Sequence, residues 1–524
     1  MEGRRALIFV GLVTAAGFAL RLHQYGQSMM GDEMSTLWIV QNHGLSGVIS
    51  QVSGDAEITP PLSFLLSWLA TKLGSDPNLI RLPALIAGTA TIPLVFALGR
   101  RTVGQVAGLL AAVLMALSPF MTYFSGNGRG YAVLILLLAG STMAMIRAIG
   151  SERPLGWWIL YAALSCLAMY THYTALFVLL AQFIWLLWAV PKARLTATLF
   201  NLGAAVLFLP WLPSLFTDLD SPTQSILEAI QGDGLDSKVF AVKQWAFGHP
   251  LIDPAHFPGS KVMLIISAGL ALAAIATLLV WLQRRKPVET SAESGAGKEA
   301  GAGALVPHGL ALIVMIALAA PLCEALLTLV GTDLFGARNM TASWYGFAIA
   351  VSALILAPGG AATLVSLILV FGGYGIAAAK LFQDVNQTID AKTAARLIED
   401  MRRPGDVVID RTAVKTTPVP LSPLEAYLSG KVDFSPGLST SDPPFLPFDP
   451  GVTPPAEDMK EGYRQAEGNR ALVLVIEDGS PDSQLDLPPG AYVISSEEIP
   501  AYIPTRLYTI GFRPVARTRV ADAG

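Results

Sequence analysis

The chain has 524 residues, of which 53% are hydrophobic and only 14% are charged, and its mean hydropathy is +0.53. This composition is too apolar for an ordinary soluble enzyme and predicts a polytopic membrane protein. The formal net charge of −4 provides no strongly basic balance, which argues against nucleic acid as a partner.

The first hydrophobic segment sets the predicted orientation. The chain opens with the basic sequence MEGRR, and an apolar run follows over residues 6–20. The positive-inside rule therefore keeps the N-terminus in the cytoplasm and places residue 26 and the chain beyond it outside. The acidic pair Asp32 and Glu33 would then face the external side. A cleaved signal peptide is the alternative, and it would leave this pair external as well.

Further apolar runs are each long enough to cross a bilayer at about 20 residues per helix, and basic clusters mark the ends that we expect in the cytoplasm. The run over residues 60–73 is short for a span and is predicted to be an interfacial amphipathic helix in the first external loop. About eleven transmembrane helices are expected, over residues 6–20, 82–98, 106–124, 131–149, 157–170, 174–190, 195–212, 262–282, 304–330, 343–357 and 361–379.

An odd number of spans places the C-terminal part of the chain outside. From residue 382 onward the chain carries 21 acidic and 14 basic residues, against 18 acidic and 21 basic residues before it. We therefore predict a membrane domain over residues 1–381 and an extracytoplasmic soluble domain over residues 382–524. The expected elements of this small α/β domain are a helix over residues 391–401, strands near residues 407–409, 472–476, 492–494 and 507–512, and an irregular Pro-rich section over residues 418–455.

The predicted topology gathers polar residues at the external ends of separate segments. An arginine at an external end runs against the positive-inside rule, which indicates that it has a specific role there. We expect these residues to line one external site. They are Asp32 and Glu33, Glu57 ahead of a Pro-Pro pair, Asn127 and Arg129 in SGNGRGY, His172 in YTHY, and Arg338 in FGARN.

The same motifs carry a family resemblance. In chain order they are GDE, EITPPLSFLLSWLATKLG, IRLPALIAGTATIPLVFALGRR, SPFMTYFSGNGRGYA, MYTHYTALF and FLPWLP. This series resembles the GT-C membrane glycosyltransferases, and within them the branch of the protein O-mannosyltransferases and of the aminoarabinose transferases that modify lipid A. The similarity covers residues 5–215 well and residues 331–357 weakly. It implies that the protein transfers a sugar from a polyprenyl-phosphate donor on the external face of the membrane, and that an aspartate of the first loop takes part in catalysis.

One base and a cationic cradle suffice for this chemistry, because a polyprenyl phosphate is already a good leaving group. Asp32 would take the proton of the acceptor hydroxyl during in-line attack, which predicts inversion, and Glu33 would orient the acceptor. Each candidate also has a structural alternative, such as a salt bridge or a membrane anchor. The remaining candidates are Arg129, His172 and Arg338 for the donor phosphate, and Glu57, Asn127, Tyr131 and Trp245 for the acceptor.

The sequence has no His/Cys cluster with zinc spacing and no nucleotide-binding loop. Many relatives carry an acid where this chain has Asn127, so no obligatory metal is expected, although a divalent cation is left open. The expected partners are the polyprenyl-phosphate sugar, membrane lipids, and a glycan, lipid or protein acceptor. The expected location is the bacterial inner or plasma membrane, where the protein would serve glycan biosynthesis of the cell envelope.

Two other functions stay open. A flippase for polyprenyl-linked glycans would need charged groups inside the helical bundle to carry a headgroup across the membrane. A non-catalytic glycan-binding scaffold would keep the arginines but would have little use for Asp32.

Overall fold

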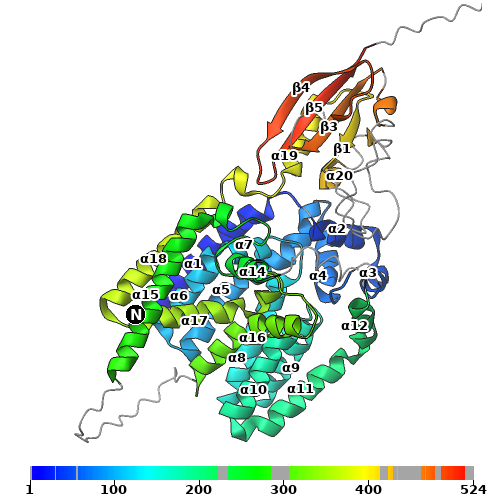
Figure 1. The fold of residues 1–524 in the computed structure, drawn as a ribbon. Coiled ribbons are helices and arrows are strands. Elements are labelled where there is room, and N and C mark those ends of the chain that lie inside the picture. Colours follow the sequence, from blue (N-terminus) through cyan, green and yellow to red (C-terminus); the bar gives the residue numbers. More distant parts are fainter. Residues whose placement is uncertain are drawn as a thin grey trace, which may run out of the picture. The chain divides into compact units, whose positions relative to one another are not determined.

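The computed structural model in Figure 1 divides into two compact units. The first unit comprises Met1–Gly26 and His43–Phe382, and the second comprises Gln27–Asn42 and Gln383–Gly524. A short segment near the N-terminus thus groups with the C-terminal part of the chain. The structure describes residues 3–29, 31–54, 57–221, 234–284, 306–412, 423–428, 433–434, 462–466, 468–477 and 485–513.

The first unit is a bundle of apolar helices (Figure 1). Its longer helices are α1 (Gly3–Tyr25), α3 (Leu45–Val52), α4 (Leu62–Ala70), α5 (Leu82–Thr102), α6 (Gln105–Leu117), α7 (Pro119–Ser125), α8 (Tyr131–Ile149), α9 (Leu155–Met169), α10 (Ala175–Ala189), α11 (Arg194–Phe208), α12 (Leu212–Leu219), α14 (Leu235–Phe247), α15 (Ser260–Arg284), α16 (Gly309–Leu329), α17 (Trp344–Leu356) and α18 (Gly360–Lys380). Short helical turns between them are η1 (Thr71–Leu73), η2 (Pro77–Arg81), η3 (Pro191–Ala193), η4 (Leu209–Trp211), η5 (Ala255–Gly259) and η6 (Asn339–Ser343).

Eight helices in the described part of the chain are long and apolar enough to cross a membrane, and the bent pair α6–α7 raises the number to as many as nine. This pair bends by 63° where Pro119, which has no N–H to donate, starts α7. Helices α9 and α10 have 15 residues each, or about 22 Å of helix. The predicted polytopic helical fold is confirmed, whereas the predicted number of about eleven spans is reached only if α9 and α10 also cross.

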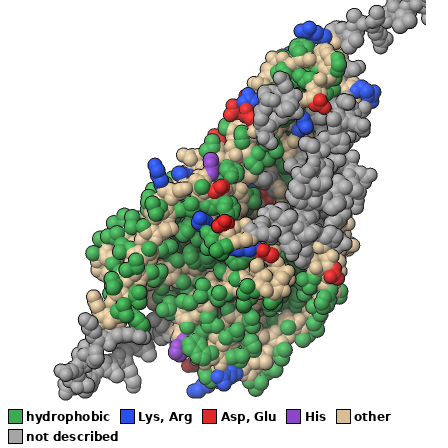
Figure 2. Space-filling model, viewed as in Figure 1, with side chains coloured by type: hydrophobic (Ala, Val, Ile, Leu, Met, Phe, Trp, Pro, Cys, Tyr) green, Lys and Arg blue, Asp and Glu red, His purple; other side chains and the backbone are tan. Residues whose placement is uncertain are grey.

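Apolar side chains cover most of the face of the helical unit that Figure 2 shows. Leu195, Leu264 and Leu326 are examples that are more than half exposed. In water such a surface would be an aggregation hazard, whereas lipid tails solvate it well. The chain is therefore an integral membrane protein.

Helix α8 separates two sets of charges. Its 19 residues span about 28 Å, close to the roughly 30 Å of the hydrocarbon core. Arg129 lies just before its first residue, and Arg147 lies in its last turn. Arg101 at the end of α5 is close enough to Arg147 and Arg100 to interact electrostatically. Arg100, Arg101 and Arg147 thus lie together at the end of the bundle opposite to Arg129.

Within the described residues, the second unit is built on a five-stranded sheet of order β2-β1-β3-β5-β4. Strand β1 is parallel to β2 and β3, whereas β5 is antiparallel to β3 and β4. The elements of this unit are α2 (Asp32–Asn42), η7 (Asp384–Asn386), α19 (Ala391–Met401), β1 (Val407–Asp410), α20 (Pro423–Leu428), β2 (Asp433–Phe434), β3 (Arg470–Ile476), β4 (Ala491–Ile499) and β5 (Thr505–Phe512).

Both faces of strands β1, β3 and β5 are covered, whereas β4 is mostly exposed. Side chains alternate along a strand, so Val407 packs with Tyr463 on one face, while Val408 packs with Ile398 of α19 and Leu424 of α20 on the other. The small C-terminal sheet region expected from the sequence is confirmed. Of the predicted Pro-rich section, α20 and β2 are described, and most of the rest lies outside the described residues.

Candidate functional site

Arg129 and Glu57 form a bidentate ion pair. Nη1 of Arg129 lies 2.8 Å from Oε1 of Glu57, and Nη2 lies 2.9 Å from Oε2. The two side chains are only 9% and 8% exposed, and the guanidinium lies over the ring of Phe64 at 5.4 Å. A pair so far removed from water is stable only because each charge is matched by the other. The structure therefore joins a residue expected to bind the donor to one expected to bind the acceptor.

Gly130 allows three segments to meet beside this pair. A Cβ atom at this position would lie 2.9 Å from Cγ2 of Thr171 and 3.0 Å from Cβ of Ser63, so any larger side chain would push them apart. The backbone N–H of Leu62 also donates to the carbonyl of Tyr170 at 2.9 Å. The start of α4, the start of α8 and the loop between α9 and α10 are thus held together.

His172 has two positively charged neighbours but is itself neutral. Burial, and then the positive charges of Arg129 and Arg338, lower the pKa of His172 to about 3. Its Nδ1 accepts a hydrogen bond from the backbone N–H of Thr174 at 3.3 Å, so the proton of the neutral ring is assigned to Nε2. His172 and the two arginines therefore lie close together, but only the arginines supply positive charge.

A neutral buried histidine makes the fold less stable in acid. The pKa of His172 is about 6.5 in the unfolded chain and about 3 in the folded protein. Its stabilising contribution is complete above pH ~6.5 and is lost as the pH falls towards 3, because the unfolded state then binds more protons. We expect His172→Gln to flatten the decline of the unfolding temperature between pH 7 and pH 4, measured in detergent, and the exposed His256→Gln to leave it unchanged. Equal slopes in the parent and His172→Gln proteins would contradict the buried neutral state.

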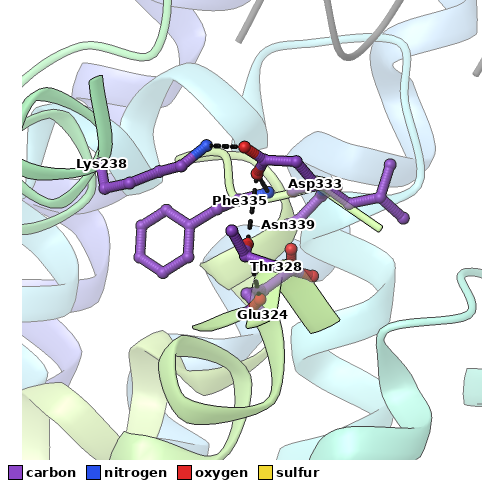
Figure 3. Close-up of polar contacts among 7 residues, drawn as sticks. Lys238, Glu324, Thr328, Asp333, Phe335 and Asn339 are labelled. Carbon is purple, nitrogen blue, oxygen red and sulfur yellow. Dashed lines mark hydrogen bonds and ion pairs between the residues drawn. The ribbon is translucent and has the colours of Figure 1, made fainter. Parts of the chain in front are cut away.

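The loop that leads to Arg338 is anchored by an ion pair (Figure 3). Lys238 of α14 pairs with Asp333, whose carboxylate also accepts hydrogen bonds from Oγ1 of Thr328 and the backbone N–H of Phe335, each at 3.2 Å. Burial alone would raise the pKa of the Asp333 carboxyl, but its hydrogen bonds, that from Lys238 foremost, bring the pKa below its ordinary value. These contacts fix the loop five residues before Arg338.

Glu324 lies next to this anchor, near the C-terminal end of α16 (Figure 3). Its side chain is 1% exposed, and its Oε2 has no hydrogen-bond partner among the described residues. Asp333 and Lys238 are both close enough to interact with it electrostatically. The single ammonium of Lys238 therefore faces two carboxyl groups.

Asn127 and Tyr131 lie on either side of Arg129 in the sequence, and both are buried. Nδ2 of Asn127 donates to the hydroxyl of Tyr123 at 3.1 Å, and its Oδ1 has no hydrogen-bond partner in the described part of the chain. The ring of Tyr131 lies 5.3 Å from the ring of His172. Both residues therefore belong to the same end of the bundle as the arginines.

Trp245 is used for packing. Its side chain is 6% exposed, its Nε1–H donates to the carbonyl of Met340 at 3.0 Å, and its ring lies 4.6 Å from that of Phe347. The indole therefore joins α14 to α17 and leaves little surface on which a sugar could stack. The contact of Trp245 with the acceptor stays a prediction.

Asp32 and Glu33 form the first turn of α2 in the second unit. Asp32 is exposed, and Glu33 is 2% exposed. Gly31 precedes them with φ 56°, a left-handed conformation that glycine adopts without strain. The two carboxylates lie at the positive end of the helix dipole, which stabilises negative charge. The other site residues expected from the sequence all lie in the first unit.

Among the described residues, no three His, Cys, Asp or Glu side chains are grouped so that they could hold a metal ion. The dispensability of a metal remains a prediction.

Comparisons with known proteins bear on the fold and the family. Residues 59–216 match the model of the dolichyl-phosphate-mannose-protein mannosyltransferase family. No curated protein sequence matches the chain. Among solved structures, ArnT from Cupriavidus metallidurans bound to undecaprenyl phosphate is 11% identical, with a TM-score of 0.51 over 97% of this chain and 98% of that chain. The archaeal oligosaccharyltransferase AglB from Archaeoglobus fulgidus, in complex with an inhibitory peptide and a dolichol-phosphate, is 12% identical, with a TM-score of 0.49 over 90% of this chain and 69% of that chain.

At 11% identity, the likeness to ArnT shows the fold alone. The shared fold extends over nearly the full length of both chains, and the family match covers the segments that carry Arg129 and His172. The resemblance to the GT-C membrane glycosyltransferases expected from the sequence is confirmed.

Proposed function

We propose that this chain, which has the fold of the GT-C membrane glycosyltransferases, transfers a sugar from a polyprenyl-phosphate donor to an acceptor hydroxyl on the extracytoplasmic face of the membrane. The observation that carries the proposal is the proximity of Arg129, Arg338 and His172 at one end of the bundle. The family name refers to a dolichyl phosphate donor, and the ArnT crystal structure holds undecaprenyl phosphate. Both are phosphates on a polyprenyl chain.

Two arginines suit such a headgroup, because the planar guanidinium binds phosphate oxygens in pairs. A guanidinium carries five N–H donors, so the two bonds from Arg129 to Glu57 are compatible with a further contact to phosphate. In this proposal Glu57 fixes Arg129, and the anchored loop fixes Arg338. His172 adds one neutral donor at Nε2. The polyprenyl tail would lie along the apolar surface of the bundle.

The proposed reaction is a displacement at the anomeric carbon. The acceptor oxygen attacks this carbon and loses its proton to the carboxylate of Asp32, while the bond between the anomeric carbon and the phosphate oxygen breaks. The sugar configuration is thereby inverted, and polyprenyl phosphate leaves as an anion that the arginines stabilise. Asn127 and Tyr131 remain candidates for contact with the acceptor.

The positions of the buried charges favour a transferase over a flippase. Charged groups along a transport path would be needed deep within the bundle. The buried charged side chains within the described spans are those of Arg21, Arg81, Asp218 and Glu324. Each lies within five residues of a helix end. Charge is thus placed where a headgroup would bind at the membrane surface.

The function is tested with the full-length protein in nanodiscs and a panel of synthetic polyprenyl-phosphate sugars. We expect at least one donor to release polyprenyl phosphate in the presence of a membrane extract that supplies acceptors, and NMR of the product to show inverted anomeric configuration. Vesicle-reconstituted protein that moves the intact donor between leaflets without cleaving it would instead show a transporter, and the proposal would be wrong.

The side of the membrane is tested with single cysteines. In a background that lacks Cys166 and Cys323, a cysteine is introduced by Ser50→Cys in α3 or by Glu152→Cys between α8 and α9, both exposed positions. We expect Ser50→Cys to react with an impermeant thiol reagent added to intact cells, and Glu152→Cys to react only after permeabilisation. The reverse pattern would place the site in the cytoplasm.

A further inference from the structure

The segment that carries Asp32 is attached to the C-terminal unit by specific hydrogen bonds. Oγ of Ser28 donates to Oδ1 of Asp390 at 2.9 Å and accepts the backbone N–H of Lys392 at 3.0 Å. The backbone N–H of Met29 donates to the hydroxyl of Tyr427 at 3.1 Å. Residues just before the candidate base therefore contact α19 and α20, which belong to the same unit.

Ser28 completes the N-terminal cap of α19. The first N–H groups of a helix have no partner within the helix and must find one elsewhere. Asp390 is the N-cap residue and accepts the N–H of Thr393 at 3.0 Å, and Ser28 accepts the preceding N–H, that of Lys392. A side chain 362 positions away in the sequence thus serves as part of the helix cap. The contact is built into the fold of the unit.

The path from this cap to Asp32 is short. Met29, which binds Tyr427, is three residues before Asp32. Gly31 turns the chain with φ 56°, and its carbonyl accepts the N–H of Met34 at 2.9 Å. The position of the Asp32 carboxylate is therefore set by α19 and α20 through a few residues.

We infer that Ser28, Asp390 and Tyr427 are positioning residues through which the C-terminal unit holds Asp32 in place. The inference rests on the proposed role of Asp32 as the base. It gives the C-terminal unit a part in catalysis that does not require it to touch the donor. A misplacement of about 1 Å can cost roughly 10²-fold in rate, so modest changes in this unit have large effects on turnover.

The test separates kcat from donor binding. Ser28→Ala removes the hydrogen bonds to Asp390 and Lys392, and Tyr427→Phe removes the bond to Met29 and leaves the α19 cap intact. We expect kcat for transfer to fall roughly 10- to 100-fold in the first and less in the second, with the Kd of polyprenyl phosphate unchanged, because the donor residues lie in the first unit. Ser28→Thr, which keeps the hydroxyl, should retain more activity than Ser28→Ala. The matched controls are Ser496→Ala and Tyr492→Phe on the exposed strand β4, and both should behave like the parent protein.

Combining Ser28→Ala with Asp32→Asn in one protein distinguishes the positioning role of Ser28 from the proposed role of Asp32 as the base. If Ser28 acts through Asp32, Ser28→Ala should cost nothing further in the Asp32→Asn protein. A full additional loss in that protein, or an unchanged kcat in both Ser28→Ala and Tyr427→Phe, would overturn the inference and leave the proposed function standing. Parental turnover in Asp32→Asn alone would instead refute the proposed base. If Ser28→Ala fails to fold, Tyr427→Phe still decides between these outcomes.

Discussion

Asp32→Asn is expected to lower kcat for transfer by about 10²–10⁴-fold, the usual loss when a positioned base is removed. Asparagine has almost the same shape as aspartate but cannot accept the proton of the acceptor hydroxyl. The side chain is exposed at the start of α2, so the substitution creates no cavity. Folding and donor binding should therefore stay close to those of the parent protein.

A matched control is available in α14. Asp236 is also an exposed acid in the first turn of its helix, so Asp236→Asn removes a comparable charge at a comparable position. Initial rates of polyprenyl phosphate release should be normal in this control and nearly absent in Asp32→Asn. If both variants turn over at the parental rate, Asp32 is not the base, and Glu33 becomes the next residue to test.

Arg129→Ala is expected to damage folding as well as donor binding. The substitution leaves the carboxylate of Glu57 buried without its partner, and breaking a buried pair in this way costs about 3–5 kcal/mol of stability. A loss of activity in this single variant would therefore say little about the donor. The double variant Arg129→Met/Glu57→Gln removes both charges and should recover much of the stability.

The double variant isolates the role of the arginine in donor binding. We expect it to bind polyprenyl phosphate more weakly by about 1.5–3 kcal/mol, the contribution of a hydrogen bond to a charged group. Competition with a fluorescent polyprenyl phosphate measures this loss, and a thermal unfolding scan of the same sample checks the fold. Parental affinity in a well-folded double variant would mean that Arg129 serves only to balance Glu57.

Elements determined by local patterns were predictable from the sequence. The helix expected over residues 391–401 is α19, because its apolar residues recur with helical spacing. The strands expected near residues 407–409 and 507–512 lie within β1 and β5. These short runs are apolar throughout or alternate between apolar and polar residues, and both patterns are typical of strands that bury apolar side chains in a sheet. The apolar spans were predictable for the same reason, since their length is fixed by the thickness of a bilayer.

Pairings between distant residues were not predictable. Glu57 and Arg129 are 72 positions apart, and Lys238 and Asp333 are 95 positions apart, and no local pattern marks either pair. The neutral state of His172 depends on burial and on two arginines from other segments. The packing of Trp245 against Phe347, 102 positions later in the chain, is likewise marked by no local pattern.

The cap that joins Ser28 to Asp390 also orders events during biosynthesis. Ser28 is synthesised 362 residues before Asp390, and at ~5–20 residues per second roughly 20–70 s of translation separate the two. During that interval the spans of the bundle enter the membrane, whereas α19, to which Ser28 is hydrogen-bonded in the finished protein, has not yet been synthesised. Under the proposed mechanism, a ribosome-bound chain would carry Arg129 and Arg338 while the segment of Asp32 is still unattached. The same proposal implies that the nascent protein would begin transfer only after α19 has been made.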